Sequence, residues 1–359
     1  MPTQTQRFAR RRAGVVMVAV SLVLAGCGAK RAASSRHSDP SSTSASSTST
    51  TMPGPPVDPL TGQAPANPAD LHRPALVVKI DNVDPARPQA GVDDADVVYE
   101  EEVESQLTRL MAVYQSADAA QVGPVRSTRT SDIDIVSALN RPLYAYSGGN
   151  TGFVQQLDAA PIADVGATTY GEPYYFMAGP HDSPHNLYAR TADLFQLASK
   201  AGGPPPPLFN YRAAAAPATG AGAIPAAKVT LSFGMETSLW TWNASAQVWE
   251  RTQDGTPDVM QDGTQLVAAN VIVQMTPYTT DGVASGEGID PPPPIPKALT
   301  VGAGTCTAFT GGDMIPCNWS KASATAVTQY TDLAGAPIQL APGKTWVELA
   351  PIGTPVAVG

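Results

Sequence analysis

Two arginines behind a turn are the first candidates for chemistry in this sequence. The stretch QVGPVRSTRTSD sets Arg126 and Arg129 around a Ser-Thr pair, directly after a Gly-Pro turn. Ser and Thr favour the start of a helix, where free N–H groups and the helix dipole attract anions. Two guanidinium groups this close repel each other unless carboxylates or a bound anion face them. The arginines are therefore either neutralised by internal Asp or Glu side chains, the commoner outcome for such pairs, or they bind a negatively charged ligand.

A strand of alternating acids, ADVVYEEEVE, is predicted upstream of the arginines. Alternation places Glu100, Glu102 and Glu104 on one face of it. If a tight Ser-Gln turn joins this strand to the following LTRLMAVYQS, Glu102 lies opposite Arg109 and the other two acids lie diagonal to it. Exposed ion pairs contribute less than about 1 kcal/mol each, so these two strands alone favour a solvated charged face.

One imidazole is placed for acid–base chemistry. His185 stands in a Pro-His-Asn motif, with His181 as the other candidate, but a lone histidine is more often structural. No neighbouring Ser or Cys fits a nucleophile elbow. The glycine turn SGGN before Thr151 is compatible with close approach of a ligand, although a plain turn is the simpler interpretation. We find no phosphate loop, dinucleotide fingerprint or zinc signature, and so expect no cofactor and no metal.

The elements that position these residues alternate between strands and helices. ALVVKI predicts a buried strand with a polar end, the acidic strand and its successor predict a hairpin, and PLYAYSGGN predicts a further strand. Helices are predicted in STRTSDIDIVSALN, capped by Ser127 or Ser131, in GFVQQLDAA, and from about Thr191. The pattern predicts an α/β fold with a layered, mixed sheet over residues 71–203.

The second half of the chain is strand-rich. Residues 204–227 are rich in Pro and Ala and predict a linker. Residues 228–359 contain the strand-like segments KVTLSF, SLWTWN, VWERT, QLVAANVIVQM, ALTVG, TCTAF, PIQLA and TWVELAP, separated by Gly-containing turns. We therefore expect an α/β N-terminal domain followed by a strand-rich C-terminal domain.

Residues 1–26 are typical of an export signal. Four arginines precede the apolar run AGVVMVAVSLVLA, which suits a signal-peptide core and is too short to span a bilayer. The LAGC motif ending at Cys27 resembles a bacterial lipobox, whose cysteine receives a thioether-linked diacylglycerol; an ordinary secretory signal with a chance cysteine is the alternative. Residues 27–70 are rich in Ser, Thr and Pro and predict a disordered tether. We expect an extracytoplasmic protein anchored to the membrane by a lipid on Cys27.

The charge of the chain excludes several partners. Cleavage after residue 26 removes four arginines and no acid, so 22 basic residues become 18 against 31 acidic ones, a balance of −13. Such a charge opposes binding to nucleic acid, or to an anionic membrane by electrostatics alone. Aromatic residues make up 6%, too few for a base-stacking surface to be the first guess.

The remaining cysteines predict a disulfide. Cys306 and Cys317 form an even pair in an exported chain and flank a Gly-Gly-Asp turn. A bridge there contributes about 2–3 kcal/mol in the chain-entropy model. Metal binding is the weaker alternative, because no His or further Cys lies nearby in the sequence.

Taken together, these motifs resemble the YerB-like bacterial lipoproteins, a family built from two adjoining domains of unknown function. The matching stretches are DPLTG, VKIDN, ARPQAG, ADVVYEE, TRLMAVYQS, VGPVRSTR, YSGGN, PHNLY, NVIVQM and GKTWVEL, which span nearly everything after residue 57. Two features depart from the family. Related sequences tend to have Gly-Gly where this chain has Ser105-Gln106, so the tight turn assumed above need not form, and the cysteine pair is a local addition.

The resemblance implies which polar residues belong together. We expect them to line one cleft, where strand ends meet helix starts. They are Asp81, Asn82, Arg87, Gln89, Glu100, Glu104, Arg109, Arg126, Arg129, Asn150, His185 and Asn186.

Three functions compete for this cleft. We favour a binding lipoprotein whose Arg126 and Arg129 clamp an anionic envelope ligand, such as a cell-wall fragment, with acids positioning the arginines and His185 donating a hydrogen bond. An envelope hydrolase or transferase is the alternative, with Glu100 or Glu104 as base and His185 as acid. A third reading is a non-catalytic assembly scaffold whose polar cluster is structural. The resemblance decides between none of them, since the family's own role is unsettled.

Overall fold

The computed structural model describes residues 56–179, 181–233, 235–281 and 295–359. All of them belong to one compact unit, Gly54–Gly359. The predicted export signal, Cys27 and the predicted tether up to residue 55 lie outside the described residues.

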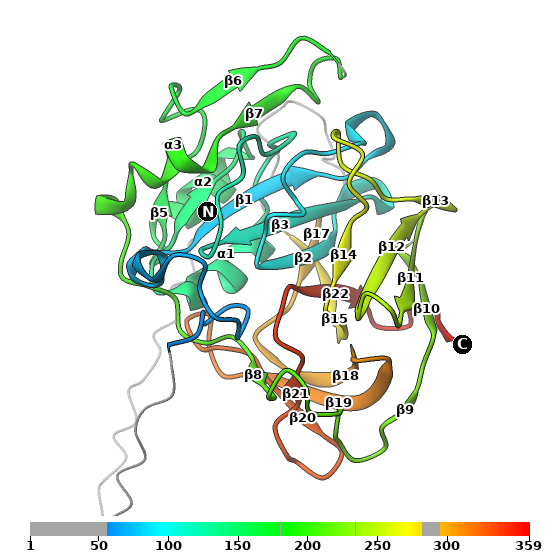
Figure 1. Ribbon diagram of the computed structural model, residues 1–359. Coiled ribbons are helices and arrows are strands. Elements are labelled where there is room, and N and C mark those ends of the chain that lie inside the picture. Colours follow the sequence, from blue (N-terminus) through cyan, green and yellow to red (C-terminus); the bar gives the residue numbers. More distant parts are fainter. Residues whose placement is uncertain (1–55, 180, 234, 282–294) are drawn as a thin grey trace, which may run out of the picture. The chain divides into compact units, whose positions relative to one another are not determined.

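An 11-stranded mixed sheet runs through this unit (Figure 1). Its strands, in spatial order, are β20 (Gln329–Asp332), β19 (Asp313–Lys321), β18 (Gly302–Thr310), β15 (Asn270–Thr276), β22 (Thr345–Pro351), β2 (Val97–Glu102), β3 (Thr108–Tyr114), β1 (Leu76–Asp81), β4 (Leu143–Ala145) and β5 (Ala163–Asp164), with β9 (Ile224–Pro225) paired to β19. Strand β22 lies between β15 and β2 and is parallel to both. One sheet therefore joins strands of both predicted domains, and the division into domains stays a prediction.

A smaller sheet of six strands is built from the second half of the chain alone. It contains β13 (Thr256–Pro257), β12 (Val248–Gln253), β11 (Glu236–Asn243), β10 (Lys228–Phe233) and β23 (Val356–Val358) in that order, with β14 (Val267–Ala268) paired to β12. Three two-stranded ribbons complete the strands: β16 (Tyr278–Asp281) with β17 (Ile295–Ala298), β8 (Asn210–Tyr211) with β21 (Gln339–Leu340), and β6 (Tyr174–Phe176) with β7 (Leu187–Ala189).

The described helices are short and belong mostly to the first half. They are α1 (Thr130–Val136), α2 (Thr151–Asp158) and α3 (Thr191–Phe195), with 3-10 turns η1 (Pro68–His72), η2 (Asp84–Ala86), η3 (Glu104–Gln106), η4 (Ser137–Leu139) and η5 (Ala198–Lys200). The predicted helices in the segments that begin at Ser127, Gly152 and Thr191 are thus found, each shorter than the sequence pattern suggested.

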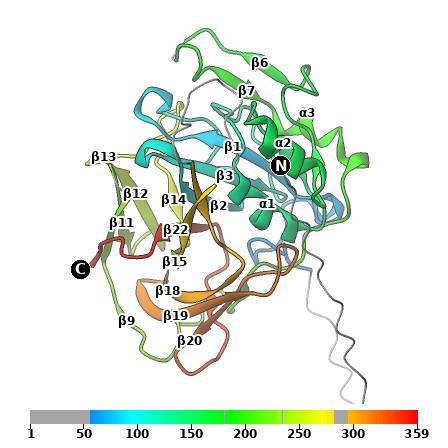
Figure 2. The ribbon, with the colours of Figure 1, turned by 180° about the vertical axis from the view of Figure 1, so that it is seen from behind.

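Alternation along β1, β2 and β3 creates two hydrophobic cores, one on each face of the large sheet. Leu76 and Val78 face the small sheet and share a core with Trp240 of β11. Val77 and Met111 point the other way and pack with residues of α1 and α2, which Figure 2 shows beside β1 and β3. The fold is a mixed sheet layered between helices and a second sheet, which confirms the predicted α/β first half and strand-rich second half.

Candidate functional site

Asp81 lies at the centre of the candidate site. It ends β1, and its Oδ2 lies 2.8 Å from Nε of Arg126 and 2.8 Å from Nδ1 of His185. The Asp81 side chain is 1% exposed, whereas that of Arg126 is 24% exposed and that of His185 is 18% exposed. One buried carboxylate therefore holds a guanidinium and an imidazole that both still reach solvent.

The backbone around Gly123 brings Arg126 and His185 together. The N–H of Arg126 donates to the backbone of β1 at 2.9 Å, and the N–H of Val125 donates to the carbonyl oxygen of Leu187 in β7 at 2.7 Å. Gly123 has a φ of +151°, and a Cβ there would lie 2.7 Å from the ring of Tyr188. The segment is thus held between β1 and β7 at a position where a side chain would be strained.

Glu104 neutralises the second arginine of the motif. Its Oε2 accepts a hydrogen bond from Nε of Arg129 at 2.8 Å, and its Oε1 accepts another from Nη2 of the same side chain. Arg129 also donates to the carbonyl oxygen of Thr128 at 2.7 Å, and its side chain is 8% exposed. Arg109 approaches the same carboxylate, with Nη2 3.6 Å from Oε1. Arg129 is therefore fully engaged within the protein.

The arginines outnumber the carboxylates that face them. Three guanidinium groups, from Arg109, Arg126 and Arg129, share Asp81 and Glu104. Burial lowers the pKa of Arg109 to about 10, and the charge of Arg129 adds to the decrease. Burial alone would raise the pKa of Glu104, but the hydrogen bonds and charge of Arg129 lower it to about 2. The cluster is held by its carboxylates and retains an uncompensated positive charge.

A second layer of polar residues supports this cluster from behind. Asn82 donates through Nδ2 to Glu100 at 3.1 Å and to the hydroxyl of Thr108 at 2.7 Å, and Gln89 donates to Oδ1 of Asn82 at 2.8 Å. The other oxygen of Glu100 accepts a hydrogen bond from Nη2 of Arg251 at 2.8 Å. Arg251 belongs to β12 of the small sheet, so this buried layer ties the two sheets together.

A cleft of about 540 Å³ opens over the cluster. It is lined by Asp81, Val83, Asp84, Pro85, Glu104, Leu107, Arg109, Arg126, His185, Met235, Glu236 and Asp254. We call Asp81, Glu104, Arg109, Arg126 and His185, together with Arg129 that pairs with Glu104, the arginine wall. We call Asp84, Glu236 and Asp254, together with Arg87 that pairs with two of them, the acidic wall.

The acidic wall contains residues that the sequence-based reasoning missed. Glu236 begins β11 and Asp254 follows β12, so both come from the second half of the chain. Arg87 contacts Asp84, and its Nη2 also lies 3.0 Å from Oδ2 of Asp254. Glu236 carried one signal that was overlooked: it shares the inward face of its strand with Trp240, where an acid is unexpected.

The expected site residues fall into three groups. Five of them line the cleft: Asp81, Glu104, Arg109, Arg126 and His185. Five others lie behind it or at its rim: Asn82, Gln89, Glu100, Arg129 and Arg87. Asn150 instead caps α2, where its Oδ1 accepts from the N–H of Gly152 at 3.0 Å, and Asn186 accepts through its backbone from Met177 at 2.9 Å.

The register expected for the acidic hairpin is wrong by one residue. Glu101, not Glu102, lies opposite Arg109, and Glu102 pairs with Thr108. The connection is η3, in which Ser105 has a φ of 63° and Gln106 a φ of 57°, rather than a tight two-residue turn. A slip of one residue exchanges the faces of a strand. Arg109 consequently shares the face of Glu101, which is bonded to the buried Lys79, rather than the face of Glu100 and Glu102.

The expected anion site at the helix start is also wrong. Helix α1 begins after Arg129, and the backbone N–H of Arg129 donates to Oδ2 of Asp132 at 2.7 Å. Ser131 does not cap the helix, because its hydroxyl accepts a hydrogen bond from the N–H of Ala298 at 2.9 Å. The protein's own carboxylate thus occupies the place proposed for a ligand.

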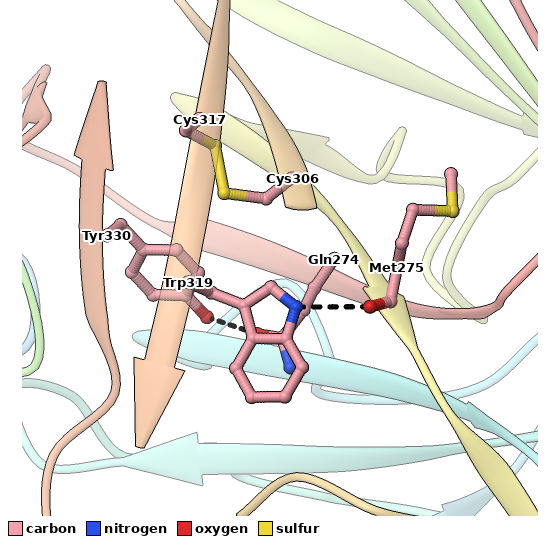
Figure 3. Close-up of a disulfide and its surroundings, with 6 residues drawn as sticks. All are labelled: Gln274, Met275, Cys306, Cys317, Trp319 and Tyr330. Carbon is pink, nitrogen blue, oxygen red and sulfur yellow. Dashed lines mark hydrogen bonds between the residues drawn. A yellow bond between two sulfur atoms is a disulfide. The ribbon is translucent and has the colours of Figure 1, made fainter. Parts of the chain in front are cut away.

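The predicted disulfide is present away from the cleft. Cys306 of β18 and Cys317 of β19 lie directly opposite each other and are bonded (Figure 3). Beside them, Nε1 of Trp319 donates to the carbonyl oxygen of Met275 at 3.0 Å, and the hydroxyl of Tyr330 donates to Gln274 at 2.8 Å. The bridge joins neighbouring strands of the large sheet and plays no part in the cleft.

The described residues show neither a metal-binding cluster nor a membrane-spanning helix. In residues 56–179, 181–233, 235–281 and 295–359, no cluster of three His, Cys, Asp or Glu side chains is arranged to hold a metal ion. Over the same ranges, no helix combines the length and apolar character needed to cross a membrane.

Comparison with known proteins confirms the resemblance seen in the sequence. Residues 60–203 match the N-terminal domain, and residues 229–347 the C-terminal domain, of a protein of unknown function, DUF3048. The chain is 26% identical over 304 residues to the "Putative lipoprotein YerB" of Bacillus subtilis, covering 82% of this chain and 86% of that protein. The crystal structure of the YerB protein from Bacillus subtilis has a TM-score of 0.71 at 20% identity and covers 84% of this chain and 99% of its own. The fold is therefore that of YerB.

Proposed function

This chain belongs to the family that combines the DUF3048 N-terminal and C-terminal domains, and we propose that it is a cell-envelope lipoprotein that binds an oxyanion at the arginine wall of its cleft. The relative named as a lipoprotein supports the first part of this proposal. The composition of the arginine wall supports the second.

One observation carries the binding proposal: three guanidinium groups face only two carboxylates, and one of the three is still open to solvent. Arg129 is paired with Glu104, and Arg109 is only 8% exposed. Arg126 is 24% exposed and shares its only carboxylate with His185. A guanidinium that is fixed in place but incompletely paired binds a further oxyanion at little entropic cost.

The ligand class follows from the donors. Arg126 and His185 contact the same carboxylate oxygen and are both partly exposed, so the N–H groups that do not face Asp81 could donate to two oxygens of a carboxylate, phosphate or sulfate group. The envelope supplies such groups on cell-wall fragments, phosphate-bearing glycans and carboxylated peptide ends. This modifies the expectation from sequence, because Arg126 and His185 replace Arg126 and Arg129 as the binding pair.

Calorimetric titration of the full chain with sodium sulfate tests the binding proposal. The Arg126→Gln variant should bind sulfate about tenfold or more weakly, because it loses a charge-assisted hydrogen bond. The matched control is Arg190→Gln, since Arg190 is 56% exposed and pairs with Asp193 away from the cleft. Equal affinities in all three proteins would overturn the proposal. Turnover of a cell-wall fragment that His185→Ala abolishes would instead support the enzyme alternative.

Membrane attachment requires its own test. We propose that the lipid on Cys27 holds the protein at the outer face of the cell membrane. The tether predicted up to residue 70 has to end before Asp58, because Leu60 is buried in the core of the folded unit and Pro68–His72 form η1. Cys27→Ser should move the protein from the membrane fraction to the soluble fraction and abolish incorporation of a labelled fatty acid. Unchanged membrane association in that variant would contradict the anchor.

A further inference from the structure

Among the acids that the described residues bring to the cleft, Glu236 alone takes part in no ion pair. Its side chain lines the cleft, and the residue is 7% exposed. Among the described residues, the ion pairs of the acidic wall join Arg87 to Asp84 and Asp254, and none includes Glu236. A buried carboxylate without a cation is costly, so its protonation state needs an explanation.

The hydroxyl of Thr108 supplies that explanation. Its Oγ1 lies 2.5 Å from Oε2 of Glu236 and 2.8 Å from Oε1 of Glu100, while it accepts a hydrogen bond from Nδ2 of Asn82 at 2.7 Å. A hydroxyl carries a single proton, so it can donate to only one of the two carboxyl oxygens. The other carboxyl group must supply its own proton to make its bond.

Glu100 is the carboxyl group to which Thr108 donates. Its Oε2 accepts a hydrogen bond from Arg251 at 2.8 Å, and its Oε1 also accepts from Asn82 at 3.1 Å. These donors stabilise a carboxylate and leave the Thr108 proton directed at Glu100. Glu236 is then the proton donor in its bond with Thr108.

We infer that Glu236 is a ligand-facing residue of the cleft that carries a proton at mildly acidic pH, and that its ionisation expels the bound oxyanion. As a neutral acid it leaves the positive charge of the arginine wall uncancelled. As a carboxylate it adds a negative charge inside the cleft and repels an anion at Arg126. The inference deepens the proposed function and rests on it for the ligand class only.

The charges around Glu236 support this assignment. They are Glu100 and Arg251 behind it, Arg87, Asp84 and Asp254 beside it, and Asp81, Glu104, Arg109, Arg126 and His185 on the facing wall. Burial raises the pKa of Glu236 to about 7, and the charge of Glu100 adds to the rise. Ionisation thus falls near neutral pH.

Infrared difference spectroscopy of the full chain tests the protonation state without any ligand. The wild-type protein should show the carbonyl band of a neutral carboxylic acid at pH 6 that is absent in Glu236→Gln and lost by pH 9. Other buried acids contribute equally to both proteins and cancel. If no such difference band exists, Glu236 is already a carboxylate and the inference is wrong. ¹³C-glutamate NMR of the wild type gives the same answer from the titration of its Cδ, should the variant not fold.

Sulfate titrations at pH 6 and pH 9 test the consequence, since sulfate does not titrate in this range. We expect the wild type to lose affinity about three- to tenfold more than Glu236→Gln over this range, the effect of one charge a short distance away. Changes elsewhere in the cleft are common to both proteins. Equal losses would overturn the role of Glu236. Absence of sulfate binding at both pH values would overturn the proposed function instead, while the infrared result still decides the protonation state.

Discussion

Arg251 and Arg126 both face carboxylates, but one is enclosed and the other is open. Arg251 is fully buried, donates to Glu100 at 2.8 Å and contacts Asp258, and its Nη1 and Nη2 also donate to neutral oxygens of Gln253 and Ser238. Arg126 is 24% exposed and shares one carboxylate with His185. The enclosed arginine is out of reach of a ligand because it is buried, and it joins two sheets. The open one has both a free side and incomplete neutralisation.

The difference shows why arginine content alone does not locate a binding site. Both arginines are held by buried acids, and both contribute to one continuous polar network through Glu100, Asn82 and Asp81. What separates them is solvent access and the number of carboxylates per guanidinium. Four changes test this comparison, and they are ordered here by the size of the expected effect.

Removing the enclosed guanidinium should have the largest effect. Arg251→Ala leaves Glu100 and Asp258 buried without their cation, so the free energy of unfolding should fall by about 3–5 kcal/mol. Chemical denaturation of the full chain measures it. Arg190→Ala, at an exposed position, is the control and should change stability by less than about 0.5 kcal/mol. A loss as small as the control's would mean that Arg251 does not join the sheets.

Arg129 should behave as an intermediate case. Arg129→Gln should lower the free energy of unfolding by about 1–2 kcal/mol at pH 7, because Glu104 loses its partner at a partly hydrated site. The folded pKa of Glu104, about 2, is below its ordinary 4.5. Its contribution is therefore complete above pH 4.5 and disappears as the pH falls towards 2. Denaturation at several pH values should give free energies of unfolding that become equal for wild type and variant as the pH falls towards 2. A difference in free energy that does not change with pH would contradict the pairing of Arg129 with Glu104.

Glu236→Gln should have an effect of the opposite sign. The folded pKa of Glu236, about 7, is above its ordinary 4.5, so the folded state binds the proton more tightly. Stability from this group is present below pH 4.5 and is lost as the pH rises through 7. The variant should match the wild type near pH 4 and exceed it by about 1 kcal/mol at pH 9, after allowance for hydration of the cleft. Thermal unfolding at both pH values measures this. A variant that is less stable than the wild type at pH 9 would contradict the claim that folded Glu236 holds its proton more tightly than the unfolded chain does.

Arg126→Gln should have the smallest effect on stability. Asp81 keeps His185 as a partner, and the exposed guanidinium contributes less than about 1 kcal/mol to folding. The variant should therefore unfold within that margin of the wild type in the same denaturation experiment. A loss comparable to that of Arg251→Ala would place Arg126 among the structural arginines and favour the scaffold alternative.

Local patterns in the sequence were sufficient to predict much of this fold. The buried strand before Asp81, the hairpin after it and the Cys306–Cys317 bridge all follow from short-range signals. The position of Arg126 beside His185 followed only from the family resemblance, because the two residues lie 59 positions apart and the strands that join them are short.

The remainder depended on contacts that no local pattern encodes. The left-handed backbone of Ser105 and Gln106 sets the register of the acidic hairpin. Neither residue type is typical of that backbone conformation, so the turn could not be predicted from the sequence. Glu236 reaches the cleft because β22 inserts beside β2 and brings the small sheet onto the large one. Its bond to Thr108 spans 128 positions of sequence. A carboxyl group placed in this way is recognisable only from the tertiary structure.

The most direct test of the account observes the two arginines at once. In ¹⁵N-arginine-labelled protein, the Nε–Hε resonance of Arg126 should shift on addition of sulfate at pH 6 and reach saturation, while that of Arg251 stays unchanged. Arg126→Gln and Arg251→Lys identify the two signals. A saturable shift of Arg126 alone is the predicted result. A resonance of Arg126 that does not move, or that moves only together with Arg251 without saturation, would contradict the claim that the open arginine is the binding group.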